Sequence, residues 1–417
     1  MSADAKPSAL APFRIRAFRF QWPADLMTSW AFEMETIMLG WYILVETRSV
    51  LLLTVFASMQ HLGTLLAPFV GVMADRHGTR NVLCAMRAFY CLLATTLMTF
   101  TLLGLLTPLH VFVIAGLLGL VRPSDIGMRV ALVGDTMPPA QLVGAMGIQR
   151  TTQDSAKIAG ALSGAGLVAV LGMGPAYVVV ASFYAISVLF TLKAGSRKAA
   201  RTQTSAADGA APASPWRDLK EGLKYVWNTP RLLAVMCLAF LLNLTAFPIF
   251  NGLLPYVAKE IFFIDQTGLS YMVASAASGA LFTSVALSRG GAFRPETLMM
   301  VGCIGWYAFL LVFSNVPHYG PGIVLLFLAG VFHSLNQVPM AAILLRSTDE
   351  RFRSRVQGIR MLAIYANMPG LLIAGQLIPL IGYRATGSIY CIFGIAVSVL
   401  ICVRYRTQLW QRRGEEA

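Results

Sequence analysis

The chain has 417 residues, of which 57% are hydrophobic and only 12% are charged, and its formal net charge is +14. Its mean hydropathy of +0.66 excludes an ordinary soluble protein and is typical of a polytopic, all-α membrane protein. Such a basic balance suggests nucleic-acid binding in a soluble chain, but here Lys and Arg gather in alternate loops between apolar segments, so membrane topology explains it.

Apolar windows of about 20 residues predict the membrane-spanning helices. Twelve are found, at residues 22–45, 50–74, 82–106, 110–134, 141–171, 175–194, 231–257, 266–288, 296–315, 321–345, 356–381 and 385–404. We therefore expect two pseudo-symmetric bundles of six helices. The expected parts are a cytoplasmic N-terminal segment (1–21), a first bundle (22–194), a cytoplasmic linker with an amphipathic helix (195–230), a second bundle (231–405) and a cytoplasmic tail (406–417).

The distribution of basic residues predicts the orientation. Loops on one side carry 24 Lys and Arg, whereas the other side carries Arg48, Lys259 and Arg384. Since basic loops stay in the cytoplasm, both termini are expected there. The polar N-terminal segment leads directly into a full-length span with no small-residue cleavage site, so we expect no cleaved signal peptide. The predicted location is a bacterial inner membrane.

The first span is unusually acidic. A charge at the bilayer centre costs about 2.5 to 3.5 kcal/mol on insertion scales, so buried acids indicate function. Asp25, Ser29, Glu33 and Thr36 follow one polar stripe, whereas Glu35 lies about 200° around the helix from Glu33. The two glutamates therefore cannot line the same cavity.

A charged turn, GVMADRHGTR, interrupts two long apolar runs at residues 71–80. Glycines in it permit close helix approach and a tight turn, and an Asp beside basic residues can cap and pair. The turn resembles the loop between the second and third helices of the major facilitator superfamily. Matching positions are Gly71, Asp75, Arg76, Gly78 and Arg80, and Thr79 departs from the usual basic residue. The resemblance implies a transporter in which this loop takes part in conformational change.

The fourth and fifth spans each carry three ionisable residues on one helical face. They are Arg122, Asp125 and Arg129 in the fourth, and Arg150, Asp154 and Lys157 in the fifth. Because the two helices run antiparallel from a Pro-Pro turn, acids and bases can interleave by depth. One interpretation is a structural lattice of ion pairs. The other is a functional set whose positive excess attracts an anionic substrate group or the acids of the first span.

Glu33 is the favoured proton carrier, because a buried carboxylate near a movable positive charge can change its protonation between two compartments. Glu35 is the alternative, and a glutamate held in a permanent pair with Arg122 or Lys157 is the third possibility. Two further carboxylates, Asp125 and Asp154, are additional candidates for proton coupling.

The only long polar segment, GSRKAARTQTSAADGAAPASP, is typical of a flexible linker. After it, Leu219, Leu223 and Val226 lie on one helical stripe, with Trp216 and Trp227 near the ends. This pattern predicts an amphipathic helix on the inner membrane surface.

The second half has polar and aromatic candidates at membrane depth. They are Asn243, Asn251, His333, Asn336, Arg360 and Tyr365. Amides in membrane helices more often hold helices together than bind ligands. A histidine suits a proton relay, although a hydrogen-bonded structural role is the alternative for His333. Together with Asp25 and the bases of spans four and five, these residues are expected to line a substrate cavity between the halves.

The two halves resemble each other in sequence at a spacing of 210 residues. AGALSGAGLVAVLG (159–172) aligns with PGLLIAGQLIPLIG (369–382), which pairs Gly160 with Gly370 and Gly172 with Gly382. Chance similarity of two apolar helices is the alternative explanation. Parallel repeats are expected of facilitator halves.

Several segments also resemble the efflux branch with enterobactin-exporter-like and macrolide-efflux-like proteins. They are RPSDIGMRVALVGDTMPP, AKIAGALSG, EGLKYVWNTPRLL, DERFRSRVQG and PGLLIAG. The resemblance implies export of a small hydrophobic or amphiphilic molecule in exchange for protons. Where such exporters usually carry Gly-Pro in the fifth helix, this chain has Gly160-Ala161, which puts in doubt a mechanism that needs a bend there.

The chain has no HExxH, G-x-S-x-G or Walker motif and no Cys/His grouping, so we expect neither an enzyme nor a cofactor or metal site. The expected partners are a small-molecule substrate, protons and the lipid bilayer, with no nucleic acid, and the protein is expected to be a monomer. A lysophospholipid flippase and a solute importer of the same superfamily remain alternatives.

Overall fold

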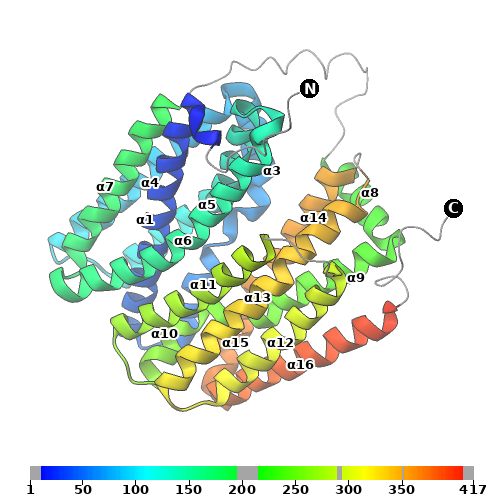
Figure 1. The fold of residues 1–417 in the computed structure, drawn as a ribbon. Helices are drawn as coiled ribbons and strands as arrows, with labels where there is room; N and C mark the ends of the chain where they lie inside the picture. The colour runs from blue at the N-terminus through cyan, green and yellow to red at the C-terminus, as the bar shows by residue number, and fades with distance from the viewer. Residues whose placement is uncertain (1–10, 195–214, 289–293, 350–351, 407–417) are drawn as a thin grey trace. The chain divides into compact units, whose positions relative to one another are not determined.

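The computed structural model describes residues 11–194, 215–288, 294–349 and 352–406. Every regular element within these ranges is helical (Figure 1), which confirms the all-α class. Two compact units divide the chain. The first comprises residues 1–46 and 59–209, and the second comprises residues 47–58 and 210–417.

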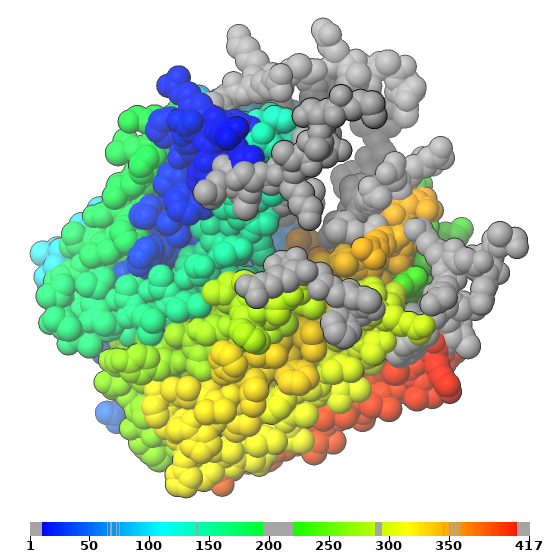
Figure 2. All heavy atoms as spheres, in the orientation of Figure 1, coloured from blue at the N-terminus to red at the C-terminus, as the bar shows by residue number. Residues whose placement is uncertain are grey.

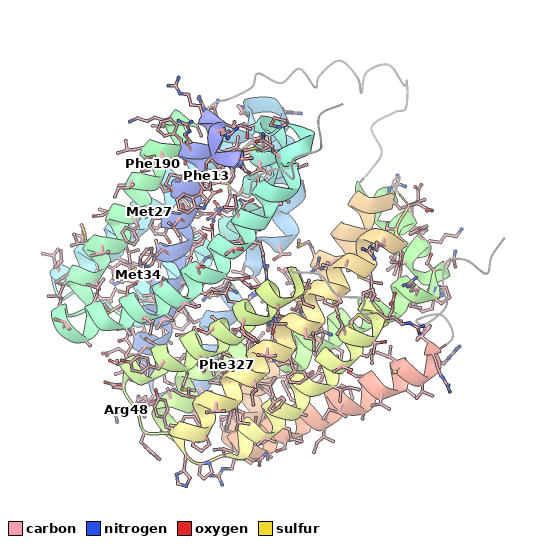
Figure 3. All side chains as sticks on the ribbon, in the orientation of Figure 1. Phe13, Met27, Met34, Arg48, Phe190 and Phe327 are labelled. Carbon is pink, nitrogen blue, oxygen red and sulfur yellow. The ribbon has the colours of Figure 1, made fainter. Side chains whose placement is uncertain are left out.

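The first unit is built from α1 and five further helices. They are α1 (Arg16–Thr47), α3 (Ala67–His77), α4 (Thr79–Leu102), α5 (Pro108–Thr136), α6 (Pro139–Leu171) and α7 (Met173–Lys193), with the short η1 (Ala11–Arg14) and η2 (Leu62–Leu66). The start of α1 is held by an apolar cluster in which Phe18 packs with Val133, Met137 and Ala145 at the α5–α6 turn. Phe13, labelled in Figure 3, adds an edge-to-face contact with Phe18, with ring centroids 5.2 Å apart.

Helix starts follow the sequence. The hydroxyl of Thr107 caps α5, and the His110 side chain accepts from the Thr107 backbone N–H, which completes a capping box. Pro108 and Pro139 stand in the first turns of α5 and α6, where a missing N–H costs no hydrogen bond. These signals place the fourth and fifth spans, which carry the candidate charges.

The second unit contains the remaining helices. They are most of α2 (Val50–Met59), α8 (Pro215–Asn228), α9 (Pro230–Leu241), η4 (Leu242–Ala246), η5 (Pro248–Gly252), α10 (Leu254–Tyr256), η6 (Val257–Ile261), α11 (Gln266–Ser288), α12 (Pro295–Asn315), α13 (Tyr319–Ser347), α14 (Arg353–Tyr365), α15 (Asn367–Ile381) and α16 (Tyr383–Arg404). Helix α12 packs between α13 and α16, and the atoms of these three helices form one continuous face of the unit (Figure 2).

Ten helices in the described ranges are long and apolar enough to cross a membrane. The other two predicted spans correspond to α1, which carries acids, and to a second span that is divided. That span was predicted at residues 50–74, but α2 ends at Met59 and α3 begins at Ala67, with a proline in its first turn. The eleventh span is likewise divided at Ala366.

The seventh span lies close to its predicted position, but much of it is π-helical rather than α-helical. After α9 it continues through three π-helical segments, η4, η5 and η6, as far as Ile261. Pro248 begins the second of them, where its missing N–H interrupts the regular hydrogen-bond ladder.

The spacing of 210 residues reappears in the geometry. Gly172 and Gly382 both end one helix and precede the next, with φ of 83° and 82°, a conformation that glycine adopts without strain. A β-carbon on Gly160 would lie 3.0 Å from the carbonyl oxygen of Trp30 in the first span. Its counterpart Gly370 meets the backbone of η4, in the seventh span, in the same way. The paired glycines therefore serve the same packing role in each unit.

Candidate functional site

Helix α1 runs against α6 in direct backbone contact. A β-carbon on Gly160 would lie 2.6 Å from Glu33 Cβ, and one on Gly164 would lie 3.0 Å from the Cα of Met34. The Trp30 indole N–H also donates to Ser163 Oγ at 2.7 Å. Small residues on α6 thus hold α1 closely, and α6 runs unbroken through Gly160-Ala161.

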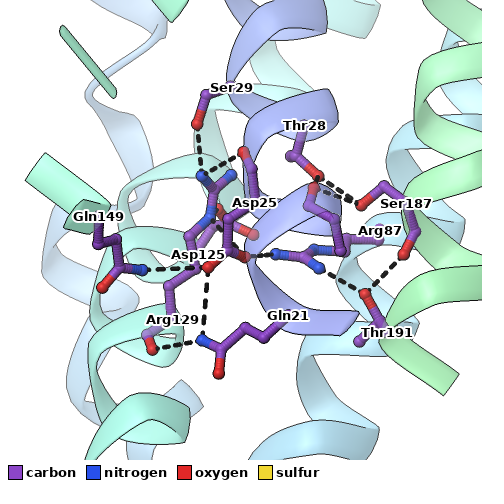
Figure 4. A network of polar contacts seen from close by, with 11 residues as sticks. Gln21, Asp25, Thr28, Ser29, Arg87, Asp125, Arg129, Gln149, Ser187 and Thr191 are labelled. Carbon is purple, nitrogen blue, oxygen red and sulfur yellow. Dashed lines mark hydrogen bonds and ion pairs between the residues drawn. The ribbon is translucent and has the colours of Figure 1, made fainter. Parts of the chain in front are cut away.

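Asp25 is the centre of a buried polar network (Figure 4). Its side chain is 5% exposed and forms an ion pair with Arg87 of α4, whose side chain is fully buried. Arg129 Nε lies 3.9 Å from the same carboxylate, and the amides of Gln149 and Gln21 donate to it at 3.2 and 3.4 Å. Asp25 therefore receives two cations and two neutral donors.

Arg129 connects this network to α5. It forms an ion pair with Asp125 one helical turn away on α5, and it donates to Ser29 Oγ at 2.6 Å and to the Asp25 carbonyl oxygen at 3.2 Å. The four charged groups Asp25, Arg87, Asp125 and Arg129 are all buried. They comprise two acids and two bases, so the network is electrically balanced.

Helix α7 completes the network through hydroxyl groups. Arg87 donates to Thr191 Oγ1, and the hydroxyls of Thr28 and Ser187 form a hydrogen bond with each other. Ser187 also donates to the Ala24 carbonyl oxygen at 3.0 Å. Polar groups of α1, α4, α5, α6 and α7 thus meet around the segment of α1 from Gln21 to Ser29 (Figure 4).

Glu35 lies in a separate environment of aromatic rings. It is 2% exposed, and the Tyr184 hydroxyl donates to its Oε2 at 3.0 Å. Tyr184, Tyr90 and Phe32 are in mutual ring contact, with centroids 5.0 to 5.8 Å apart. In the described part of the chain, Glu35 forms no ion pair.

Glu33 and Arg122 differ from the groups of the Asp25 network. Glu33 is half-buried, and its carboxylate makes no hydrogen bond or ion pair with any described residue. Arg122, also half-buried, donates to Thr36 Oγ1 and Gln60 Oε1, both at 3.1 Å, and its guanidinium lies 4.0 Å from the Phe32 ring centroid. The direct contacts of Arg122 are therefore neutral groups, and its charge also interacts electrostatically with the buried Glu35.

The charges of α6 lie mostly outside this core. Asp154 is buried and pairs with Arg150 at 3.3 Å, but the Arg150 side chain is 60% exposed, and Lys157 is exposed. The sequence allowed charges of the fourth and fifth spans to interleave. Among the described residues, the ion pairs instead form within α5, within α6 and toward α1.

The second-unit candidates do not form one cluster in the described contacts. Asn243 and Asn336 are buried and donate to backbone carbonyls: Asn243 to Ala239 of its own span at 2.8 Å, and Asn336 of α13 to Met299 of α12 at 2.9 Å, which ties those two helices together. Asn251 is exposed, whereas Arg360 and Tyr365 are half-buried. His333 packs among Trp306, Phe247 and Phe250, with ring centroids 4.6 to 5.4 Å away.

The charged turn at residues 71–80 ends α3 and begins α4. Gly78 separates the two helices with φ of 86°, as its place in the motif requires. Thr79, the position that departs from the motif, donates to Asp135 Oδ2 at 2.8 Å and so ties the turn to the end of α5. Arg76 is exposed, Gly71 and Arg80 are half-buried, and the side chain of Asp75 lies outside the described part of the structure.

Sequence reasoning missed Arg87 as a site residue. It is the only ionised group in its long apolar run, which is a signal that it needs a buried partner, but the sequence does not show which helix α4 packs against. In the described residues, no group of three or more His, Cys, Asp or Glu side chains is placed to hold a metal ion. An apolar helical bundle with buried, balanced charges is typical of a polytopic membrane protein.

Comparison with known proteins identifies the family. The profile of the Major Facilitator Superfamily matches residues 24–368, and the chain belongs to this superfamily. It is therefore a secondary transporter for small molecules and a multi-pass membrane protein, and not an enzyme. No curated protein matches the sequence significantly.

Solved structures agree with the fold. The crystal structure of the nucleoside transporter NupG aligns with a TM-score of 0.68 at 16% identity, over 95% of this chain and 100% of NupG. The POT family transporter PepTSo aligns with a TM-score of 0.71 at 12% identity, over 95% and 99%. The human organic anion transporter MFSD10 (TETRAN) aligns with a TM-score of 0.65 at 15% identity, over 93% and 99%. At these identities the likeness concerns the fold alone.

Proposed function

We propose that the protein is a proton-coupled exporter of a small hydrophobic or amphiphilic molecule, of the siderophore or drug type, which works by alternating access. The observation that carries the proposal is the contrast among the acids of α1. Asp25 forms ion pairs with Arg87 and Arg129, whereas neither Glu33 nor Glu35 forms an ion pair with a described residue. The resemblance to the enterobactin-exporter-like and macrolide-efflux-like branch supports the export direction.

Asp25 is unsuited to carry the transported proton. Its protonation would leave the buried charges of Arg87 and Arg129 with one remaining acid, Asp125. Breaking a buried ion pair by removing one partner costs about 3 to 5 kcal/mol. Asp25 and Asp125 therefore act as fixed counter-charges that keep α1, α4 and α5 together.

Glu33 is the proposed proton-binding group. It is half-buried, so it can exchange a proton with water, and no described residue holds its carboxylate. A change of charge on such a group alters its attraction to nearby cations, which can bias two conformations. Glu35 is the alternative, because it is buried, accepts a hydrogen bond from the Tyr184 hydroxyl and interacts with Arg122 only electrostatically.

Arg122 is the proposed recognition group for an anionic or zwitterionic part of the substrate. Its direct contacts are a hydroxyl, an amide oxygen and an aromatic face, and it interacts with the buried Glu35 only electrostatically, without a direct ion pair. A substrate carboxylate or catecholate can form the direct, paired hydrogen bonds with the guanidinium that its present contacts do not supply. An anionic substrate is thus favoured over a cationic one.

The test is transport in liposomes after a susceptibility screen of a deletion strain has supplied the substrate. Substrate flux driven by a pH gradient is measured for the wild-type protein and for Glu33→Gln, Glu35→Gln and Glu46→Gln. Glu46 is exposed near the end of α1 and serves as the matched control. We expect Glu33→Gln to abolish gradient-driven flux while Glu46→Gln retains it. Coupled flux that persists in Glu33→Gln but is lost in Glu35→Gln transfers the role to Glu35, and persistence in both rejects proton coupling through α1.

Two functions of the same superfamily are outcomes of the same assay. Flipping of radiolabelled lysophospholipid in place of solute export identifies a flippase, and uptake in right-side-out vesicles identifies an importer. The proposed setting is a bacterial inner membrane, with both termini in the cytoplasm as the loop charges favour, and the protein is proposed to be a monomer.

A further inference from the structure

Helix α8 has two faces that do different things. One face is buried in the second unit through Gly222 and Val226, with Tyr225 partly buried beside them. The opposite face is exposed and carries Lys220, Leu223, Lys224 and Trp227, which follow the i, i+3, i+4, i+7 spacing of one helical stripe. The sequence predicted Leu223 and Val226 on the same apolar stripe, but the structure separates them, since Val226 is 2% and Leu223 is 53% exposed.

The buried face of α8 packs against the turn between α13 and α14 and the start of α14. Arg355 Nη1 pairs with Glu221 Oε2 at 2.9 Å, and the rings of Tyr225 and Phe352 stack with centroids 4.3 Å apart and an interplanar angle of 3°. The Asp349 backbone N–H donates to the Tyr225 hydroxyl at 3.2 Å. A β-carbon on Gly222 would lie 3.0 Å from Arg355 Cβ, so the two helices are in close contact.

The exposed face of α8 lies directly before the start of the seventh membrane-spanning segment. Helix α8 ends at Asn228, the extended Thr229 breaks it, and residues 230–252 form an apolar segment long enough to cross a membrane. Trp227, next to that break, is 70% exposed. Tryptophan favours the boundary between lipid and water, and lysines beside it attract negative headgroups.

We infer that the exposed face of α8, formed by Lys220, Leu223, Lys224 and Trp227, binds anionic phospholipid at the membrane surface. The two lysines match headgroups that carry a net negative charge, and the leucine and tryptophan enter the headgroup boundary. Because the other face of α8 grips the α13–α14 turn, bound lipid also steadies the first turn of α14. The inference requires only the membrane location of the chain and not the substrate or direction proposed above.

The binding test uses nanodiscs of phosphatidylcholine and phosphatidylglycerol at a fixed ratio, with bromine on the acyl chains of one lipid at a time. Bromine quenches nearby tryptophan, and the difference between wild type and Trp227→Phe isolates the contribution of Trp227. We expect stronger quenching by brominated phosphatidylglycerol, reflecting an enrichment of up to about fivefold per lysine. Lys220→Gln/Lys224→Gln is expected to remove the difference. The control Lys193→Gln/Arg406→Gln changes charge equally at exposed positions off α8 and is expected to keep it.

Two results overturn the inference. Equal quenching by both brominated lipids shows that α8 has no preference for anionic headgroups. Absence of quenching at Trp227 shows that this face does not contact lipid. An acidic protein is then the partner that matches its two lysines.

The link to α14 is measured by hydrogen–deuterium exchange of its first-turn amides in the same nanodiscs. Exchange is expected to be slower with phosphatidylglycerol than with phosphatidylcholine alone. Tyr225→Ala, which removes the stacking with Phe352, is expected to abolish that slowing while leaving the quenching of Trp227 unchanged. Exchange that does not depend on the lipid in the wild-type protein refutes the link.

Discussion

Asp25 and Arg87 are predicted to be strongly coupled in stability. The network of two acids and two arginines is neutral, and every member is at most 5% exposed in its side chain. Asp25→Asn leaves one arginine without a counter-charge, and Arg87→Met leaves one acid without a base. Each single change is expected to cost about 3 to 5 kcal/mol. The double variant leaves the balanced Asp125–Arg129 pair, so it should be less destabilised than the sum by about 2 kcal/mol.

The coupling is measured by a double-mutant cycle on purified protein in detergent micelles, with denaturant unfolding followed by circular dichroism. The control cycle uses Arg150→Met and Asp154→Asn, because Arg150 is 60% exposed and such pairs contribute at most about 1 kcal/mol. Destabilisation of the Asp25 and Arg87 variants that is simply additive would contradict the charge-balance argument. So would a coupling no larger than that of the Arg150–Asp154 pair.

Three further changes test the packing and the charged turn. Gly160→Leu is expected to destabilise the protein by about 1 to 3 kcal/mol or more, because the side chain meets α1, whereas Gly147→Leu on the same helix faces open space and should have little effect in the same unfolding assay. Gly370→Leu should cost a similar amount if the units share one packing rule, and a neutral result would disprove that equivalence. Thr79→Val removes the hydrogen bond to Asp135 and should lower stability by about 1 kcal/mol, whereas Thr79→Arg, which can pair with Asp135, should not.

The fold was largely predictable, because the length of an apolar run fixes whether a helix can cross a membrane. The class, the repeated glycines and the turn at Gly78 are all confirmed in the described residues. The breaks after Met59 and at Ala366 were not predicted, because a hydropathy window reports the polarity of side chains and not where backbone hydrogen bonds are interrupted. Prolines in the first turn of α3 and of α15 were the available signal.

The site was less predictable, because helical period assigns faces but not neighbours. It correctly placed Asp125 and Arg129 on one face, where they form an ion pair. It could not show that α4 delivers Arg87 to Asp25, since that depends on tertiary packing over 62 residues of chain. The role of Glu33 as proton carrier stays a prediction that the transport assay must decide.

The π-helical turns of the seventh span affect which sequence changes this span can tolerate. A π turn contains one residue more than an α turn, so η4, η5 and η6 place surplus residues in this span, whereas the corresponding α1 is a single α-helix. A one-residue deletion at such a turn can be absorbed as ordinary helix without changing the topology. This span can therefore gain or lose a residue and reorient its side chains without a change of topology, whereas α1 keeps a fixed register.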